Sequence, residues 1–254
     1  MRILNSLNAS RISMDGLEFA LDLGMSTKAE IFIQPVEMKD EDSESKEKDR
    51  KEMQKILDRY PDVKTHVLQT VDAGKLVKAL NNHSGKLSID HFITGGSSDN
   101  KQDYPSANMI GQLGRELDIP LLLVTEKIRK GQVKDIGVLL NDCSVDNFPN
   151  IDLLKDLAIH CDAKMHLVTL IKEISDRRNN IINYLEENVR QLGYDPCSIN
   201  TISHSRADEG LNYFVFKKDL DMIAVLNATD NDCEPVLTLE ELYREVECPI
   251  CGQF

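Results

Sequence analysis

The same order of elements occurs twice in this chain of 254 residues. Each half begins with a short apolar strand, an Asn-containing turn, a helix and a second apolar strand, at residues 2–36 and again at 134–170. Later landmarks return in the same order, at an offset of about 130 residues. A repeat of this length is a whole domain rather than a solenoid unit. We therefore expect two domains, at residues 1–126 and 134–254, joined by a short basic linker.

Within each half, short aliphatic runs alternate with amphipathic stretches, which is typical of parallel βαβ units. The strands expected are residues 3–7, 30–36, 65–69, 91–94 and 121–124, then 136–140, 164–170, 198–203, 222–226 and a short strand near Pro249. The helices expected are residues 14–25, about 45–60, 74–82 and 106–117, then 150–160, 176–192, 207–218 and 239–245. The pattern predicts an α/β fold of two tandem, open, mostly parallel five-stranded sheets with helices on both faces.

Composition excludes several classes of partner. A net charge of −13 argues against nucleic acid and anionic membranes, which select for basic surfaces. No segment approaches the ~20 apolar residues of a membrane-spanning helix. Met1 and Arg2 run directly into a strand without the apolar region of a signal peptide, so we expect a cytoplasmic protein. We expect protein partners, and allow for a homo-oligomer.

Metal binding is not expected either. The six histidines have no metal-ligand spacing, and Cys248 and Cys251 lack the second cysteine pair that a zinc site of this kind needs. We interpret these two cysteines as small apolar residues of the last strand. The charge-dense segment 39–52 is interpreted as a loop leading into an exposed helix without a binding role.

Several local sequences resemble the universal stress protein family, the first half more closely. Residues 3–10 stand where that family has an aliphatic strand ending in Asp-Gly-Ser. Residues 90–96, Asp-His-Phe-Ile-Thr-Gly-Gly, look like its Asp-aliphatic-Gly segment, and residues 118–124 look like its Pro-aliphatic final strand. The resemblance covers nearly the whole chain as a tandem pair. It implies the doubly wound fold of the adenine nucleotide alpha hydrolases, in which ligands bind beyond the carboxyl ends of the strands.

The resemblance also implies candidate ligand residues. Nucleotide-binding members contact adenine through an Asp after the first strand and a Val after the second, and wrap the phosphates with a glycine-rich loop. On those positions and beside them this chain has Asn8, Ser10, Val36, Gly95, Gly96, Ser97, Ser98 and Asn108. Asn8 retains an acceptor that could bind an adenine amine, but Asn also commonly caps helices or forms turns. We expect any small ligand between the ends of the strands at 3–7 and 91–94.

The phosphate loop is degenerate. Only its first glycine is present in any register, and Asp99 and Asp103 would place carboxylates near a triphosphate. In the second half no glycine occurs between Gly210 and Gly252. We therefore expect no resident cofactor, with ATP and AMP disfavoured.

The leading hypothesis is a non-catalytic stress-adaptation protein that acts through protein contacts or a small ligand. One alternative is an ATP- or AMP-binding module that uses the first half only. Another is a hydrolase of the related adenine-nucleotide superfamily. No Ser/His/Asp or Cys/His arrangement is readable from the spacing, so we assign no catalytic residue and expect His166 to be a core or sheet-face histidine.

Overall fold

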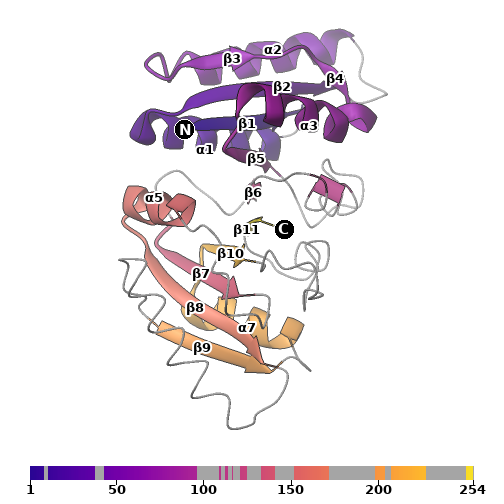
Figure 1. The fold of residues 1–254 in the computed structure, drawn as a ribbon. Coiled ribbons are helices and arrows are strands. Elements are labelled where there is room, and N and C mark those ends of the chain that lie inside the picture. Colours follow the sequence, from indigo (N-terminus) through magenta and orange to yellow (C-terminus); the bar gives the residue numbers. More distant parts are fainter. Residues whose placement is uncertain are drawn as a thin grey trace. The chain divides into compact units, whose positions relative to one another are not determined.

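The computed structural model describes residues 1–8, 11–37, 43–95, 109, 112–113, 116, 121–124, 133–140, 152–171, 198–203, 207–226 and 250–253 (Figure 1). The chain divides into two compact units, Met1–Lys130 and Gly131–Phe254. The division falls within the segment that the sequence predicts as the linker. The helices expected at 176–192 and 239–245, and most of the helix expected at 106–117, lie outside the described residues.

The first unit is a parallel sheet with helices packed against it. Its elements are β1 (Arg2–Leu7), α1 (Arg11–Thr27), β2 (Glu30–Glu37), α2 (Ser43–Leu57), β3 (Thr65–Val67), β4 (Val71–Asp72), the 3-10 helix η1 (Ala73–Lys75), α3 (Leu76–Leu87), β5 (His91–Gly95) and β6 (Leu121–Val124). The strand order is β3-β2-β1-β5-β6, and β4 pairs with β2. All of these pairs are parallel.

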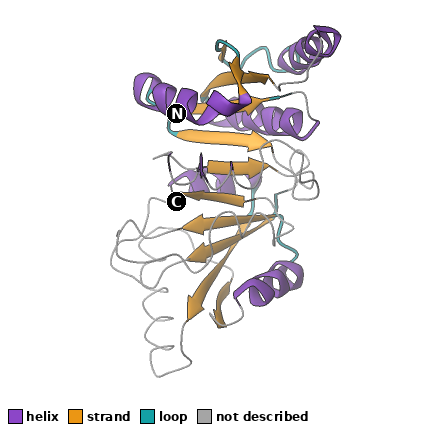
Figure 2. Cartoon of the chain, turned by 90° about the vertical axis from the view of Figure 1, so that its right-hand side faces the viewer, coloured by secondary structure: helices purple, strands orange, loops and turns teal. Residues whose placement is uncertain are grey.

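The second unit repeats this arrangement (Figure 2). Its elements are β7 (Asp135–Leu140), α5 (Asp152–Cys161), β8 (Lys164–Ile171), β9 (Ser198–Ser203), α7 (Ala207–Lys218), β10 (Met222–Leu226) and β11 (Ile250–Gln253). The strand order is β9-β8-β7-β10-β11, which is the order of the first unit, and every pair is parallel. The predicted fold class, α/β with two mostly parallel sheets, is confirmed.

Helices α1, α3, α5 and α7 all end in the same way. The residue after each helix has a positive φ angle, of 57° at Lys28, 50° at Ser88, 51° at Asp162 and 51° at Asp219. The next residue is apolar and buried in each case: Ala29, Ile89, Ala163 and Leu220. A left-handed residue followed by a buried apolar residue is the Schellman type of helix end, which turns the chain into the next strand. The two units therefore share this local device as well as their strand order.

The core of the first unit is aliphatic and centres on β1, β5 and α1. Leu4 of β1 and Leu17 and Leu21 of α1 are fully buried. Gly16 lets α1 lie directly on the end of β5, because a Cβ added there would lie 2.7 Å from the backbone N of Gly95. This packing fixes the carboxyl ends of β1 and β5, where a ligand site is expected.

Candidate functional site

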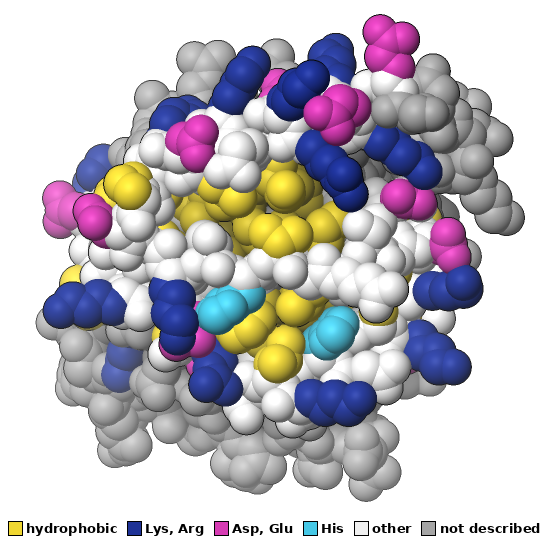
Figure 3. All heavy atoms as spheres, turned by 90° about the horizontal axis from the view of Figure 1, so that it is seen from above, with side chains coloured by type: hydrophobic (Ala, Val, Ile, Leu, Met, Phe, Trp, Pro, Cys, Tyr) yellow, Lys and Arg dark blue, Asp and Glu magenta, His cyan; other side chains and the backbone are white. Residues whose placement is uncertain are grey.

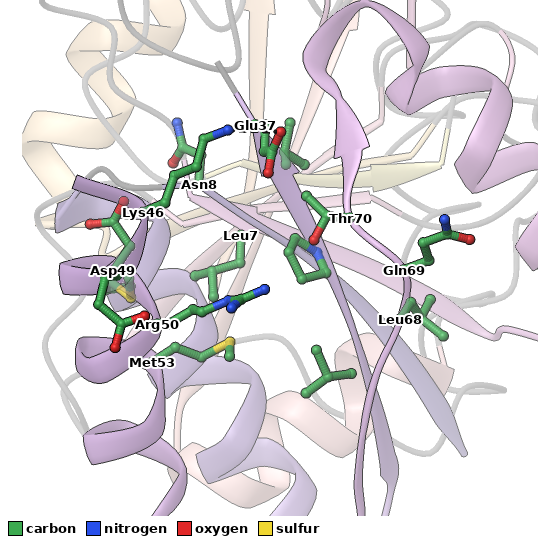
Figure 4. Close-up of a pocket in the computed structure, with 15 residues that line it drawn as sticks. Leu7, Asn8, Glu37, Lys46, Asp49, Arg50, Met53, Leu68, Gln69 and Thr70 are labelled. Carbon is green, nitrogen blue, oxygen red and sulfur yellow. Dashed lines mark ion pairs between the residues drawn. The ribbon is translucent and has the colours of Figure 1, made fainter. Parts of the chain in front are cut away.

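A cavity of about 530 Å³ lies in the first unit, at the carboxyl ends of β1, β2 and β3 and beside α2 (Figure 4). Its apolar lining consists of Leu7, Met14, Pro35, Val36, Met53, Val67 and Leu68. Its polar lining consists of Asn8, Glu37, Lys46, Glu47, Asp49, Arg50, Gln69 and Thr70. The cavity therefore combines an apolar surface with charged and amide groups, which is typical of small-molecule sites.

Strand register places the cavity residues at one edge of the sheet. Leu7 of β1 pairs with Pro35 of β2, so the residues that follow Leu7 and Pro35 lie next to each other at the ends of the two strands. The side-chain amide of Gln34 donates to the carbonyls of Gln69, at 2.7 Å, and of Pro35, at 3.1 Å. Because Gln34 is fully buried, this amide holds the segment after β3 against β2. The segment after β3 thus forms a fixed wall of the cavity.

Helix α2 supplies the charged wall. Figure 4 shows the side chains of Lys46 and Arg50 extending from α2 over the cavity. Lys46 Nζ lies 3.1 Å from Glu37 Oε2 of β2, an exposed pair that contributes ~0–1 kcal/mol. Arg50 makes no ion pair within the part of the chain that the structure describes.

The electrostatics of this wall oppose a strongly anionic ligand. The lining has three carboxylates and two cations. Burial, with the nearby Glu52 as a second cause, raises the pKa of Asp49 against the opposing effect of Lys48. A ligand with several negative charges would meet like charge here.

On the same unit, hydrophobic side chains gather at the centre of the face that Figure 3 shows, with charged side chains around them. Val67, at the end of the β3 edge strand, is half exposed and belongs to the cavity lining.

None of the described helices is long and apolar enough to cross a membrane. Among the described residues, no group of three or more His, Cys, Asp or Glu side chains is placed to hold a metal ion.

The sequence matches no protein-family model and no curated protein. Solved structures match over nearly the full length of the chain. A universal stress protein from Archaeoglobus fulgidus DSM 4304 has a TM-score of 0.69 at 15% identity, covering 99% of this chain and 97% of its own. A putative universal stress protein from Pseudomonas aeruginosa UCBPP-PA14 has a TM-score of 0.69 at 15% identity, covering 99% of this chain and 92% of its own. This chain has the universal stress protein fold.

A third solved structure, the cytoplasmic domain of a prokaryotic cation chloride cotransporter, has a lower TM-score of 0.54 at 12% identity, with coverage of 99% and 94%. At such identities the likeness establishes the fold and leaves the activity open. The resemblance seen in the sequence is therefore confirmed at the level of the universal stress protein fold.

Within this fold, three of the candidate ligand residues are described. Asn8 and Val36 are buried and line the cavity. Gly95 ends β5 and packs against Gly16, and it is not part of the cavity lining. The other candidates, Ser10, Gly96, Ser97, Ser98 and Asn108, lie outside the described residues.

Asn8 has a turn function in addition to its place at the cavity. Its backbone N–H donates to Ser13 Oγ at 2.9 Å, and Ser13 Oγ donates to the carbonyl of Ser6 at 3.3 Å. These bonds join the end of β1 to the first turn of α1. Both interpretations of Asn8, as a turn residue and as a ligand contact, are compatible with this position.

The cavity lies at the ends of β1, β2 and β3, beside the crevice that the sequence predicts between β1 and β5. Sequence reasoning missed the α2 side chains that line it, because it assigned no binding role to the charge-dense segment. The one signal available there is Met53, which begins the apolar face of α2 and lines the cavity.

Proposed function

We propose that this chain is a tandem universal stress protein that acts in stress adaptation, without a catalytic step at the cavity beside α2. In this proposal the first unit binds a small, uncharged ligand with a planar ring, such as a nucleoside, in the cavity beside α2. The observation that carries the proposal is the cavity itself, which has Asn8 and Val36 at adjacent strand ends. Its volume of about 530 Å³ lies within the ~300–1,000 Å³ range of small-molecule sites.

Two features favour a ligand without a triphosphate. The sequence retains only the first glycine of the family's phosphate loop. In addition, the carboxylates of the lining outnumber its cations, so each phosphate added to the ligand increases repulsion. We therefore propose that ATP is not a resident cofactor of either unit.

A second candidate function is an AMP- or ATP-binding module in the first unit. Arg50 favours it, because this guanidinium lines the cavity without an ion pair among the described residues. A guanidinium that is not engaged can bind a phosphate in a bidentate geometry. The two functions differ in the preferred charge of the ligand.

Equilibrium binding of adenosine, AMP and ATP to the full chain distinguishes these functions. We expect adenosine to bind more tightly than ATP. Met53→Trp should fill the cavity and weaken adenosine binding at least tenfold. Its matched control is Gln54→Trp, at the next position of α2, which is exposed and does not line the cavity.

Three results would decide against the proposal. Tighter binding of ATP than of adenosine would favour the module alternative. Equal loss of adenosine binding in both tryptophan variants would place the ligand elsewhere. Adenine nucleotide released from the denatured, purified chain and identified by chromatography would likewise favour the alternative.

A further inference from the structure

Three polar side chains on neighbouring strands of the second unit form a hydrogen-bonded series. His166 Nε2 lies 2.8 Å from Asp135 Oδ1, and His166 Nδ1 lies 2.9 Å from Ser198 Oγ. Asp135 begins β7, Ser198 begins β9, and His166 lies on β8 between them. In the parallel register His166 stands opposite both Ser198 and Gly137, two residues after Asp135. All three side chains therefore lie on one face of the sheet.

The direction of these hydrogen bonds follows from the groups involved. A carboxylate oxygen only accepts, so Nε2 of His166 donates to Asp135, and in the neutral imidazole Nδ1 is then an acceptor. In this neutral form Ser198 donates its hydroxyl proton to Nδ1. The side-chain amide of Asn200 donates to the same hydroxyl oxygen at 2.9 Å. A hydroxyl that donates to an imidazole oriented by a carboxylate is the arrangement of an activated serine nucleophile.

The imidazole of the series is more buried than the serine, as a nucleophile that must meet a substrate requires. His166 is only 7% exposed, while Ser198 is half-buried. A Cβ at Gly137, opposite His166, would lie 2.5 Å from Leu220 Cδ1, so an apolar side chain occupies the space there. The imidazole is thus buried, while the side chains of Asp135 and Ser198 are both partly exposed.

The first unit shows that the fold does not require this series. The equivalent positions, set by the same strand register, are Arg2, Phe32 and His66. There the Arg2 guanidinium donates to the carbonyl of Leu87 at 2.7 Å, and Phe32 stacks on His66 with ring centroids 4.7 Å apart. The same sheet is therefore formed in the first unit without an acid–imidazole–hydroxyl series.

We propose that Ser198 is a nucleophilic serine that accepts an acyl group from activated carboxylic esters. Its Oγ attacks the ester carbonyl carbon while its proton passes to Nδ1 of His166. The new Oγ–acyl bond forms, the ester C–O bond breaks, and the leaving alkoxide takes the proton back from Nδ1. The side-chain amide of Asn200 donates to the carbonyl of Leu167 at 3.2 Å as well as to Oγ, so it holds the serine hydroxyl in place for the attack.

The test treats the full chain with para-nitrophenyl acetate and maps acetylated serines by mass spectrometry. We expect Ser198 to be acetylated faster than any other serine, and this preference to disappear when the chain is unfolded in urea. His166→Phe introduces the side chain that the first unit has at this position, so the variant should fold. It should lower the rate of Ser198 acetylation by about 100-fold, the usual contribution of a general base.

The control is Ser203→Ala, at the opposite end of β9, which should leave the rate at Ser198 unchanged. Acetylation of Ser198 no faster than that of the exposed Ser88 would overturn the proposal. So would an unchanged rate in His166→Phe with a native circular dichroism spectrum. If His166→Phe does not fold, Asp135→Asn replaces it: this variant retains the shape of the side chain but not its charge, and an unchanged rate would overturn the proposal equally.

Discussion

Replacing Gly16 with alanine should destabilise the first unit, although the same change normally stabilises a helix. Alanine in a helix interior is favoured over glycine by about 1 kcal/mol. At Gly16, however, the added Cβ would lie 2.7 Å from the backbone N and 3.2 Å from the Cα of Gly95. Both are backbone atoms, so a side-chain rotation cannot relieve the clash.

The surroundings of Gly95 determine the size of the effect. The preceding residue, Thr94, is hydrogen-bonded to Ser6 with 2.7 Å between the two hydroxyl oxygens, and Gly95 itself pairs with Val124 of β6. The end of β5 is thus held from both neighbouring strands and cannot move away from α1 without loss. Overpacking of this kind costs ~1–3 kcal/mol. After subtraction of the helix-propensity gain of about 1 kcal/mol, we expect a net destabilisation of up to about 2 kcal/mol.

Urea unfolding followed by circular dichroism measures this difference, and amide hydrogen exchange on β1 and β5 assigns it to the first unit. The matched control is Gly85→Ala in α3, where no atom lies within 4 Å of the added Cβ. That variant should be more stable by ~0.5–1 kcal/mol. A Gly16→Ala chain as stable as the Gly85→Ala chain would show that α1 does not rest on the backbone of β5.

Three further measurements test other parts of the structure. Lys28→Gly should stabilise the chain by about 1 kcal/mol in urea unfolding, because Lys28 has a φ angle of 57° that glycine adopts without strain. The Lys64 side chain, by a hydrogen bond, lowers the pKa of Glu30 against the opposing effect of burial, so Lys64→Met should raise the Glu30 midpoint in an NMR titration. Because the pKa of Glu30 is lowered in the folded chain, ionised Glu30 stabilises the fold above its unfolded pKa, and this stability is lost as pH falls through the folded pKa. In Lys64→Met the stability should therefore depend less on pH in this acid range. ATP should bind no more tightly than about 1 mM, roughly 4 kcal/mol, and micromolar affinity in calorimetry would contradict this.

The elements of the fold could be predicted because each has its own local pattern. Strand ends were the less certain part. The strand expected at 65–69 ends at Val67, because the next residue of β2 in the alternating ladder is Pro35, which has no N–H to donate. The chain then returns to β2 as the short strand β4, which no local pattern indicated. A residue on the neighbouring strand, Pro35, decided this boundary.

The candidate site was predictable to the same extent. Asn8 follows β1 and Val36 lies near the end of β2, and parallel strands end at one edge of a sheet, so the positions of both could be found from the sequence. Arg50 could not, since only the packing of α2 beside the strand ends places it at the cavity. The series around His166 was also hidden, because its partners are 31 and 32 residues away and meet it only through strand register.

The two units share a strand order, but the candidate chemistry lies at the carboxyl ends of the strands in the first unit and at their amino ends in the second. The ligand cavity lies at the carboxyl ends of β1, β2 and β3, while Asp135 and Ser198 begin their strands at the amino ends. The two sites share no residue, so substitutions in them should act independently. Met53→Trp should weaken ligand binding and leave the acetylation rate of Ser198 unchanged, and His166→Phe should do the reverse. The double variant Met53→Trp/His166→Phe should show the sum of the two single effects, both on ligand binding and on the acetylation rate. A difference of more than ~0.5 kcal/mol from that sum in either measurement would show that the two sites are energetically coupled and that the units do not function separately.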